Sequence, residues 1–121
     1  MSGRRKSRRP YAFRQICRVF EEYLDPECEP VRVSRIQRVP NCAQGLYVGV
    51  RSKRICYVGS VSRRKGGIRS RLQSHHKRPD TWNEIWVFPF KSTIAEPSVR
   101  ACEMALIHVF DPAENVVGKA A

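Results

Sequence analysis

Five side chains in this sequence combine residue types and spacings that suit chemistry at a phosphate group. Tyr47 and Tyr57 lie ten residues apart in two short apolar segments. Arg71 and His75 are one helical turn apart, and Glu103 interrupts a long apolar stretch. A tyrosine hydroxyl can orient a water molecule, or act as a base if nearby cations lower its pKa, while an arginine offsets charge developing on a phosphate. With a carboxylate to hold Mg²⁺, these residues suit metal-assisted hydrolysis of a phosphodiester.

Glu103 is central to this hypothesis because it falls within an apolar stripe. The stripe has helical spacing and consists of Val99, Cys102, Leu106 and Phe110. An unpaired carboxylate among apolar side chains is costly, so Glu103 requires a cation, a metal ion or a cluster of hydrogen-bond donors. A structural ion pair with an arginine would also satisfy it, and Arg71 and His75 would then lie only at the solvent edge of their helix. The residues alone leave both interpretations open.

The charge distribution indicates a polyanionic partner. The net charge is +12, and residues 31–78 contain thirteen Lys and Arg but no Asp or Glu. A block of one sign repels itself unless it faces a polyanion, and phosphate neutralisation with counterion release drives binding to nucleic acid. A solvated surface that only aids solubility is the alternative. The predicted nucleic-acid-binding residues are Arg4, Arg5, Lys6, Arg8, Arg9, Arg35, Arg38, Arg63, Arg64, Lys65, Arg69 and Lys77.

The composition predicts one small globular domain with a flexible basic end. The chain has 121 residues, of which 41% are hydrophobic and 28% charged. No apolar run approaches the roughly 18 residues of a membrane span, and no apolar segment follows the basic residues 1–10 as in a secretory signal. We therefore expect an intracellular protein without membrane contact, cytoplasmic or nucleoid-associated, or nuclear in a eukaryote because the tail also resembles a nuclear localisation signal.

The five cysteines lack the spacing of metal ligands, so a structural zinc site is not expected. Reduced thiols are the simpler interpretation. Cys56 and Cys102 have apolar neighbours in the sequence and are predicted to be small core residues.

The first third of the chain predicts a helix and an extended segment. Residues 11–24 have the pattern of an amphipathic helix that ends at Asp25-Pro26. Its core-facing stripe is Phe13, Ile16, Cys17, Phe20 and Leu24. Residues 31–39 alternate apolar and polar positions, which predicts either an edge strand or an ordered arm. Such an arm would bring Arg32, Arg35 and Arg38 to a nucleic-acid backbone.

A β-hairpin is predicted to carry the two tyrosines, with the charged tetrapeptide 51–54 between its strands. Alternation places Tyr47 and Gly49 on one face of the first strand, and Ile55, Tyr57 and Gly59 on one face of the second. Direct opposition of the tyrosines requires that 47 pairs with 57 across an odd-length loop. Glycine within these strands indicates a bulge or a close approach by another group.

The remaining elements are a helix at 68–77, a strand at 81–90 and a helix at 99–110, with Pro97 in the first turn of the last helix. In the strand, Ile85, Val87 and Trp82 are expected on one face. Trp86, Phe88 and Phe90 are expected on the other. The alternation of these patterns predicts an α+β fold.

The order of the motifs resembles that of the GIY-YIG nuclease family. The matching elements are Gly45-Leu46-Tyr47, Tyr57-Val58-Gly59, Arg71 with His75, Glu103 and Asn115. Leu46 and Val58 replace the isoleucines of the family motif conservatively. Either tripeptide alone carries little weight, whereas five motif regions in the family's order are specific. The resemblance implies a small three-stranded antiparallel sheet flanked by helices, here preceded by an N-terminal helix and arm.

The resemblance also implies a catalytic role for each matched residue. Tyr47 would activate the attacking water, and Tyr57 would help to position that water or the phosphate. Arg71 would stabilise charge on the phosphate in the transition state. His75 would assist proton transfer or contact the substrate.

The same resemblance makes Glu103 the ligand of Mg²⁺ or Mn²⁺ and gives Asn115 the task of securing local structure near the active site. Residues 45–121 would form the nuclease domain, and residues 1–44 a basic tail, an amphipathic helix and an arm. The implied function is a metal-dependent endonuclease acting on double-stranded or branched DNA, restriction-like or associated with a mobile element.

The chain ends soon after Asn115, so no separate DNA-binding domain is expected. Recognition is then left to the N-terminal arm, to a homodimer or to a protein partner, or is largely absent. Two other functions remain open: a nucleic-acid-binding module on the same fold without catalysis, and a small basic protein of a ribonucleoprotein. The second explains the charge but not Glu103.

Overall fold

A four-stranded antiparallel sheet forms the centre of the computed structural model, which describes residues 10–62, 67–74 and 81–115. The strands are β1 (Val31–Val33), β2 (Gly45–Arg51), β3 (Arg54–Val61) and β4 (Glu84–Pro89), in the spatial order β1-β4-β2-β3. The helices are α2 (Tyr11–Val19), α3 (Gly67–Gln73) and α4 (Glu96–Phe110), with a 3₁₀ turn η1 (Ile36–Arg38). The predicted α+β class is confirmed.

The prediction of three strands is wrong, because a short fourth strand lies on the outer edge of β4. Val31 pairs with Val87 and Val33 with Ile85. The edge-strand interpretation of this segment therefore holds for 31–33 alone. The chain then turns away from the sheet into η1, whose end is anchored by the fully buried Val39.

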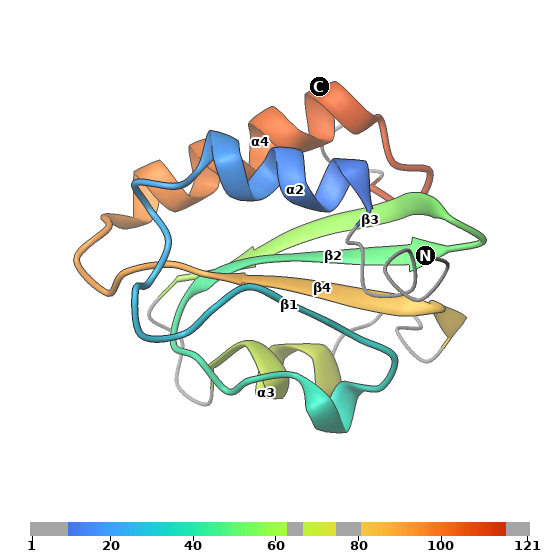
Figure 1. The fold of residues 1–121 in the computed structure, drawn as a ribbon, viewed down its shortest axis with the longest axis horizontal. Helices are drawn as coiled ribbons and strands as arrows, with labels where there is room; N and C mark the ends of the chain where they lie inside the picture. Colours follow the sequence, from blue (N-terminus) through green and yellow to red (C-terminus); the bar gives the residue numbers. More distant parts are fainter. Residues whose placement is uncertain (1–9, 63–66, 75–80, 116–121) are drawn as a thin grey trace, which may run out of the picture.

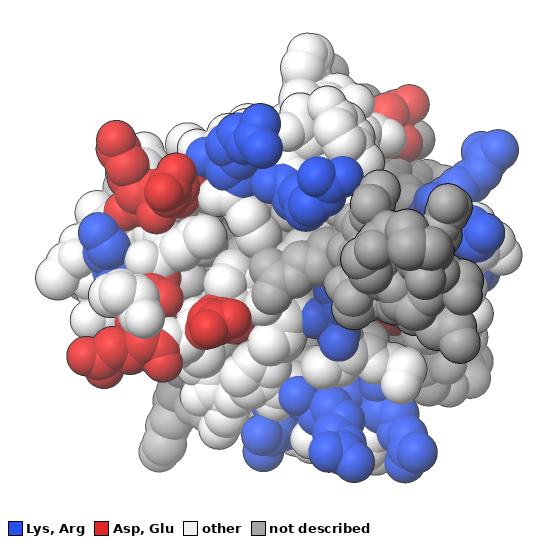
Figure 2. Space-filling view, viewed as in Figure 1, with Lys and Arg blue, Asp and Glu red and all other residues white. Residues whose placement is uncertain are grey.

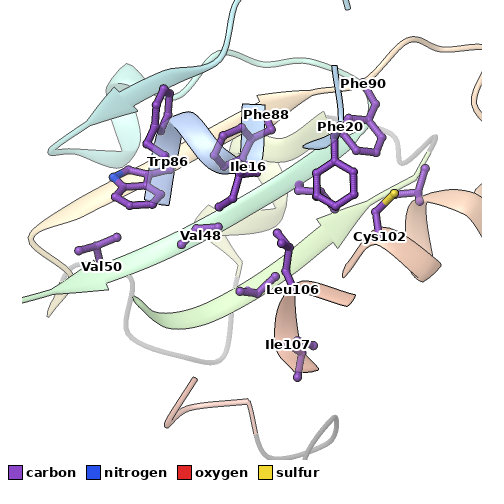
Figure 3. Close-up of a cluster of buried hydrophobic side chains, with 14 residues drawn as sticks. Ile16, Phe20, Val48, Val50, Trp86, Phe88, Phe90, Cys102, Leu106 and Ile107 are labelled. Atoms are coloured by element: carbon purple, nitrogen blue, oxygen red, sulfur yellow. The ribbon is translucent and has the colours of Figure 1, made fainter. Parts of the chain in front are cut away.

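Helices cover both faces of the sheet. In Figure 1, α2 and α4 lie side by side on one face and α3 lies on the other. The first face buries the predicted stripe of α2 against alternate residues of β2 and β4 and against α4, as Figure 3 shows. The labelled side chains there are Ile16, Phe20, Val48, Val50, Trp86, Phe88, Phe90, Cys102, Leu106 and Ile107. The predicted two-faced alternation of β2 and β4 is confirmed, and so is the burial of Cys56 and Cys102.

The opposite face buries a second apolar cluster. Its members include Tyr47, Val87, Ile68 and Leu72, with Val31 and Val33 packed against them. Because Ile68 and Leu72 come from α3, this cluster fixes the helix that carries Arg71 beneath the tyrosine face of β2.

The ends of the helices differ in part from prediction. Helix α2 ends at Val19 rather than near Leu24, because the backbone that follows pairs with the end of β4: Lys91 N donates to Tyr23 O at 2.9 Å, and Asp25 N donates to Pro89 O at 2.9 Å. Helix α4 has Pro97 in its first turn, as predicted, and ends at Asp111 in the left-handed conformation with φ of 48°. None of the helices in the described ranges has the length and apolar character needed to cross a membrane.

Candidate active site

A β-bulge in β3 puts both tyrosines on one face of the sheet. The hairpin turn has two residues, Ser52 and Lys53, with φ of 52° and 65°, and it pairs Val50 with Ile55. Continued unchanged, this even-length register would place Tyr57 opposite Val48, on the α2/α4 face. Cys56 is inserted as an extra residue, so Tyr57 is instead opposite Gly49. The extra residue shifts the pairing by one position, which puts Tyr57 on the same face as Tyr47. An odd-length loop was predicted for a register that puts the two tyrosines on one face.

The tyrosines are diagonal neighbours rather than a directly opposed pair. Tyr47 is opposite Gly59, so the predicted 47–57 pairing is wrong while the common face is present. The predicted grouping of Ile55 with Tyr57 is also wrong, because the bulge leaves Ile55 packed against the α2/α4 cluster. The tyrosine rings stack with centroids 6.2 Å apart, and Trp82 stacks on Tyr57 at 5.7 Å.

Two strand glycines make room for these rings, as the sequence predicted for a close approach. A Cβ added at Gly59 would collide with the Tyr47 ring, and one added at Gly49 would collide with the Trp82 indole. The row Tyr47–Tyr57–Trp82 thus lies close against the backbone of the hairpin. A side chain at either glycine position would push a ring out of the row.

The environment of Tyr47 keeps its hydroxyl protonated. Its side chain is 1% exposed, and burial raises its pKa well above the ordinary value, with a further increase from Tyr57. A hydrogen bond with Arg71 and the charge of that residue lower the pKa in part. Burial also raises the pKa of Tyr57, as does the charge of Glu103. In this arrangement a tyrosine orients a water molecule as a neutral hydroxyl and is a poor base near neutral pH.

Arg71 lies beside the tyrosines because the segment before β2 holds the start of α3. Ile68 N donates to Cys42 O at 2.9 Å. Gly67 begins the helix with φ of +72°, and a Cβ there would collide with the same Cys42 carbonyl. The half-buried guanidinium of Arg71 then contacts Tyr47.

Glu103 approaches from α4, on the other side of the sheet, and meets β3 at the edge of the sheet. Its Oε1 accepts a hydrogen bond of 2.7 Å from Ser60 Oγ. Arg100 Nε is 3.8 Å from the same oxygen, but its side chain is 65% exposed against 18% for Glu103. An exposed pair at that distance contributes little. The charge of Glu103 nevertheless raises the pKa of both tyrosines, so the three groups belong to one electrostatic environment.

Asn115 closes the outer edge of β3. Its Oδ1 accepts from Val58 N and its Nδ2 donates to Val58 O, both at 2.7 Å, and the residue is buried. Glu114 N also donates to Cys56 O at 2.9 Å. The amide therefore pairs with an edge strand as a neighbouring strand would. This contact lies one residue from Tyr57.

Some of the other predicted site residues lie outside the described part of the chain, and the rest lie on η1 and α3. His75, the tail residues, residues 63–65 and Lys77 lie outside the described part of the chain. Arg35 and Arg38 are exposed on η1, and Arg69 Nε donates to Val39 O at 2.8 Å. These three do not join the tyrosines.

The donors at this site fit a hard divalent cation held largely by water. Glu103 is a mostly buried carboxylate whose Oε1 accepts a hydrogen bond from the Ser60 hydroxyl. Mg²⁺ commonly keeps several waters and takes one or two carboxylates. Among the described residues there is no group of three His, Cys, Asp or Glu able to hold a metal. Glu103 would supply a carboxylate to such an ion.

A cavity of about 1190 Å³ opens elsewhere, at the hairpin end of the α2/α4 face. It is lined by Tyr11, Arg51, Lys53, Trp86 and Phe110, among others. None of the predicted catalytic residues in the described part of the chain lines it. The cavity is therefore not the site built by the tyrosines.

Two members of the site were missed in the sequence. Ser60 follows Tyr57-Val58-Gly59 directly, and its partner Glu103 lies 43 residues away. Trp82 was expected on the same face as Ile85 and Val87, which is the tyrosine face, so its face was predicted correctly but its stacking on Tyr57 was not. Only the position next to the second motif could have indicated Ser60.

No protein-family model, curated protein or solved structure matches this chain.

Proposed function

We propose that this chain is a metal-dependent endonuclease of the GIY-YIG type that hydrolyses phosphodiester bonds in DNA. One observation carries the proposal: four residues from four separate elements share one environment. Tyr47 on β2, Tyr57 on β3, Arg71 on α3 and Glu103 on α4 all contribute to the pKa values of the two tyrosines. A basic protein of net charge +12 that groups these four side chains suits phosphate chemistry.

Each side chain has a part in the proposed reaction. The Tyr47 hydroxyl accepts a hydrogen bond from Arg71, also forms a hydrogen bond with Tyr57, and remains neutral, so it would orient the attacking water rather than deprotonate it. Tyr57 lies beside it and helps to hold the water or the phosphate. The Arg71 guanidinium offsets charge as the phosphate passes to the transition state. Glu103, oriented by Ser60, would hold Mg²⁺ or Mn²⁺, which supplies Lewis-acid stabilisation of the phosphate and leaving oxygen when bound.

A nucleic-acid-binding module without catalysis is the second candidate function. The charge favours it equally, since counterion release needs no active site. It leaves unexplained why a mostly buried carboxylate is kept beside the tyrosines, where it raises their pKa values.

Cleavage of supercoiled plasmid distinguishes the two functions. We expect nicking or linearisation with Mg²⁺ and none with EDTA. Glu103→Gln should abolish cleavage and preserve DNA binding, because the amide keeps the size of the carboxylate but is a poor metal ligand. Glu96→Gln is the matched control, since Glu96 is an exposed acid in the first turn of the same helix. Wild-type protein that cleaves neither plasmid, branched DNA nor RNA contradicts the nuclease proposal.

A further inference from the structure

Positive charge gathers on the side of the molecule formed by η1 and α3. In the view of Figure 2, Lys and Arg cluster at the lower end, where Figure 1 places these two elements, with no Asp or Glu among them. Arg35 and Arg38 are exposed there, and Arg69 is half-exposed. We call these three residues the η1–α3 surface.

The fold places the three arginines on adjoining elements. Arg38 N donates to Arg35 O at 3.0 Å across the 3₁₀ turn. Arg35 is the extended residue that precedes this turn, and Arg38 is the last residue of the turn. Arg69 reaches from α3 to the end of that turn, where its Nε donates to Val39 O at 2.8 Å. That bond uses one of five N–H donors, so the rest of the guanidinium group is available to a ligand.

No carboxylate among the described residues forms an ion pair with these arginines. Other arginines of the described segments differ: Arg32 lies 3.7 Å from Glu84, and Arg51 lies 2.7 Å from Glu114. Adjacent like charges repel, and the cost is offset when an external anion lies between them. The surface is therefore complementary to a polyanion.

We infer that the η1–α3 surface binds the sugar–phosphate backbone of double-stranded DNA. The choice of DNA rests on the proposed function. Arg69 belongs to the same short helix as Arg71, which contacts Tyr47, so the surface adjoins the element that also reaches the candidate active site. The surface is built largely by residues 31–42, so this N-terminal arm serves as the docking element of the catalytic domain. Three separate arginines on a backbone give affinity without sequence preference.

An acidic surface of a second copy is the competing occupant. Exposed acids concentrate on the loop after α2, and Figure 2 shows this red cluster on the left side. The residues are Glu21, Glu22, Glu27 and Glu29. Contact between this loop and the η1–α3 surface of a neighbour would make the protein self-associate. The test below separates this contact from DNA binding.

The test is the salt dependence of binding to a labelled duplex, measured by fluorescence anisotropy in EDTA so that cleavage cannot occur. The variant Arg35→Gln with Arg38→Gln removes two exposed charges. Loss of two phosphate contacts should reduce the slope of log Kd against log salt by about 1.8. Between 50 and 200 mM salt, wild-type affinity should then fall roughly tenfold more than that of the variant. Arg69→Gln alone should reduce the slope by about 0.9.

The matched control removes two exposed charges elsewhere, through Arg18→Gln on α2 and Arg54→Gln on β3. Its salt slope should stay close to that of the wild type. An equal decrease of the salt slope in the variant and in the control, or no decrease in either, would overturn the inference. So would a variant that loses self-association in sedimentation while binding the duplex normally, or one that loses only single-stranded RNA binding.

The outcomes also separate this inference from the proposed function. If the protein shows the predicted salt slopes but cleaves no substrate, the DNA-binding surface stands and the nuclease proposal fails. If the protein cleaves plasmid while the Arg35→Gln/Arg38→Gln variant binds the duplex like the wild type, the nuclease proposal is supported and DNA binding by the η1–α3 surface is contradicted.

Discussion

Ser60 donates a 2.7 Å hydrogen bond to Oε1 of Glu103 and so joins the outermost strand to the last helix. This contact orients the carboxylate that is proposed to hold the metal. Its partner atoms are 43 residues apart in the chain, and it lies next to the Tyr57-Val58-Gly59 motif. Ser60 is therefore a positioning residue, whose effect should be seen through the metal rather than through the phosphate.

Replacement of Ser60 should change the metal requirement. Residues that orient a metal ligand typically account for 10- to 100-fold in affinity. We expect Ser60→Ala to raise the Mg²⁺ concentration for half-maximal cleavage by about tenfold, with little change in rate at saturating Mg²⁺. Ser60→Thr, which keeps the hydroxyl, should restore the wild-type requirement. The measurement is plasmid cleavage across a Mg²⁺ titration.

The control for this prediction is Ser62→Ala, two residues along the chain, whose hydroxyl contacts Gln44 rather than Glu103. An unchanged Mg²⁺ requirement in Ser60→Ala would show that the hydrogen bond has no role in metal binding.

Gly59→Ala should destabilise the protein by displacing the Tyr47 ring. The added Cβ would collide with that ring, and overpacking of this kind costs about 1–3 kcal/mol. We expect the loss in urea-induced unfolding, followed by circular dichroism. In a Tyr47→Ala background the ring is absent, so the same Gly59→Ala change should cost much less. Additive costs in the double variant would show that the two residues do not interact.

Asn115→Ala should destabilise the protein through the edge of β3. The change leaves the buried N–H and C=O of Val58 without their side-chain partner, at about 1–3 kcal/mol for each unsatisfied group. We expect at least 2 kcal/mol in the free energy of unfolding by this reasoning. Asn41→Ala serves as control because Asn41 is exposed. Equal stability of the two variants would contradict the role of Asn115.

Stability should decline at alkaline pH. Burial raises the pKa of Cys42 from 9.0 to about 12, and burial together with the charge of Glu114 raises that of Cys56 from 9.0 to about 11. The thiols of the unfolded chain ionise at lower pH than those of the folded protein. The contribution of the two thiols to the free energy of unfolding is therefore complete below pH 9 and is lost as the pH rises through their pKa values in the folded protein. Burial of Tyr47 adds to the loss above its ordinary pKa of 10.0.

The measurement is the free energy of unfolding in urea from pH 7 upward. We expect a flat region to about pH 9 and then a steady fall, as linkage requires. The variant Cys42→Ala with Cys56→Ala should have a shallower fall, whatever its stability at pH 7. A fall of the same steepness in both proteins would show that the two thiols do not contribute.

Local patterns in the sequence were sufficient for the elements and for the faces they bury. The stripe of α2, the alternation in β2 and β4 and the place of Pro97 in the first turn of α4 were all predictable, because each depends on neighbours a few residues apart. The end of α2 was not predictable in this way, because Tyr23 and Asp25 pair with residues near the end of β4. The fourth strand was left open for the same reason, since three residues become a strand only when a partner edge is available.

For the candidate site, the sequence by itself determined which side chains are available: two tyrosines near glycines, an arginine on a short helix and a carboxylate in an apolar stripe. The tertiary structure decided whether they meet. The bulge at Cys56 sets the parity that puts Tyr57 on the face of Tyr47. The fold also brings Arg71 to Tyr47 and Glu103 to Ser60. These relationships depend on strand register and on contacts across the sheet, and residue types and spacing alone do not specify either.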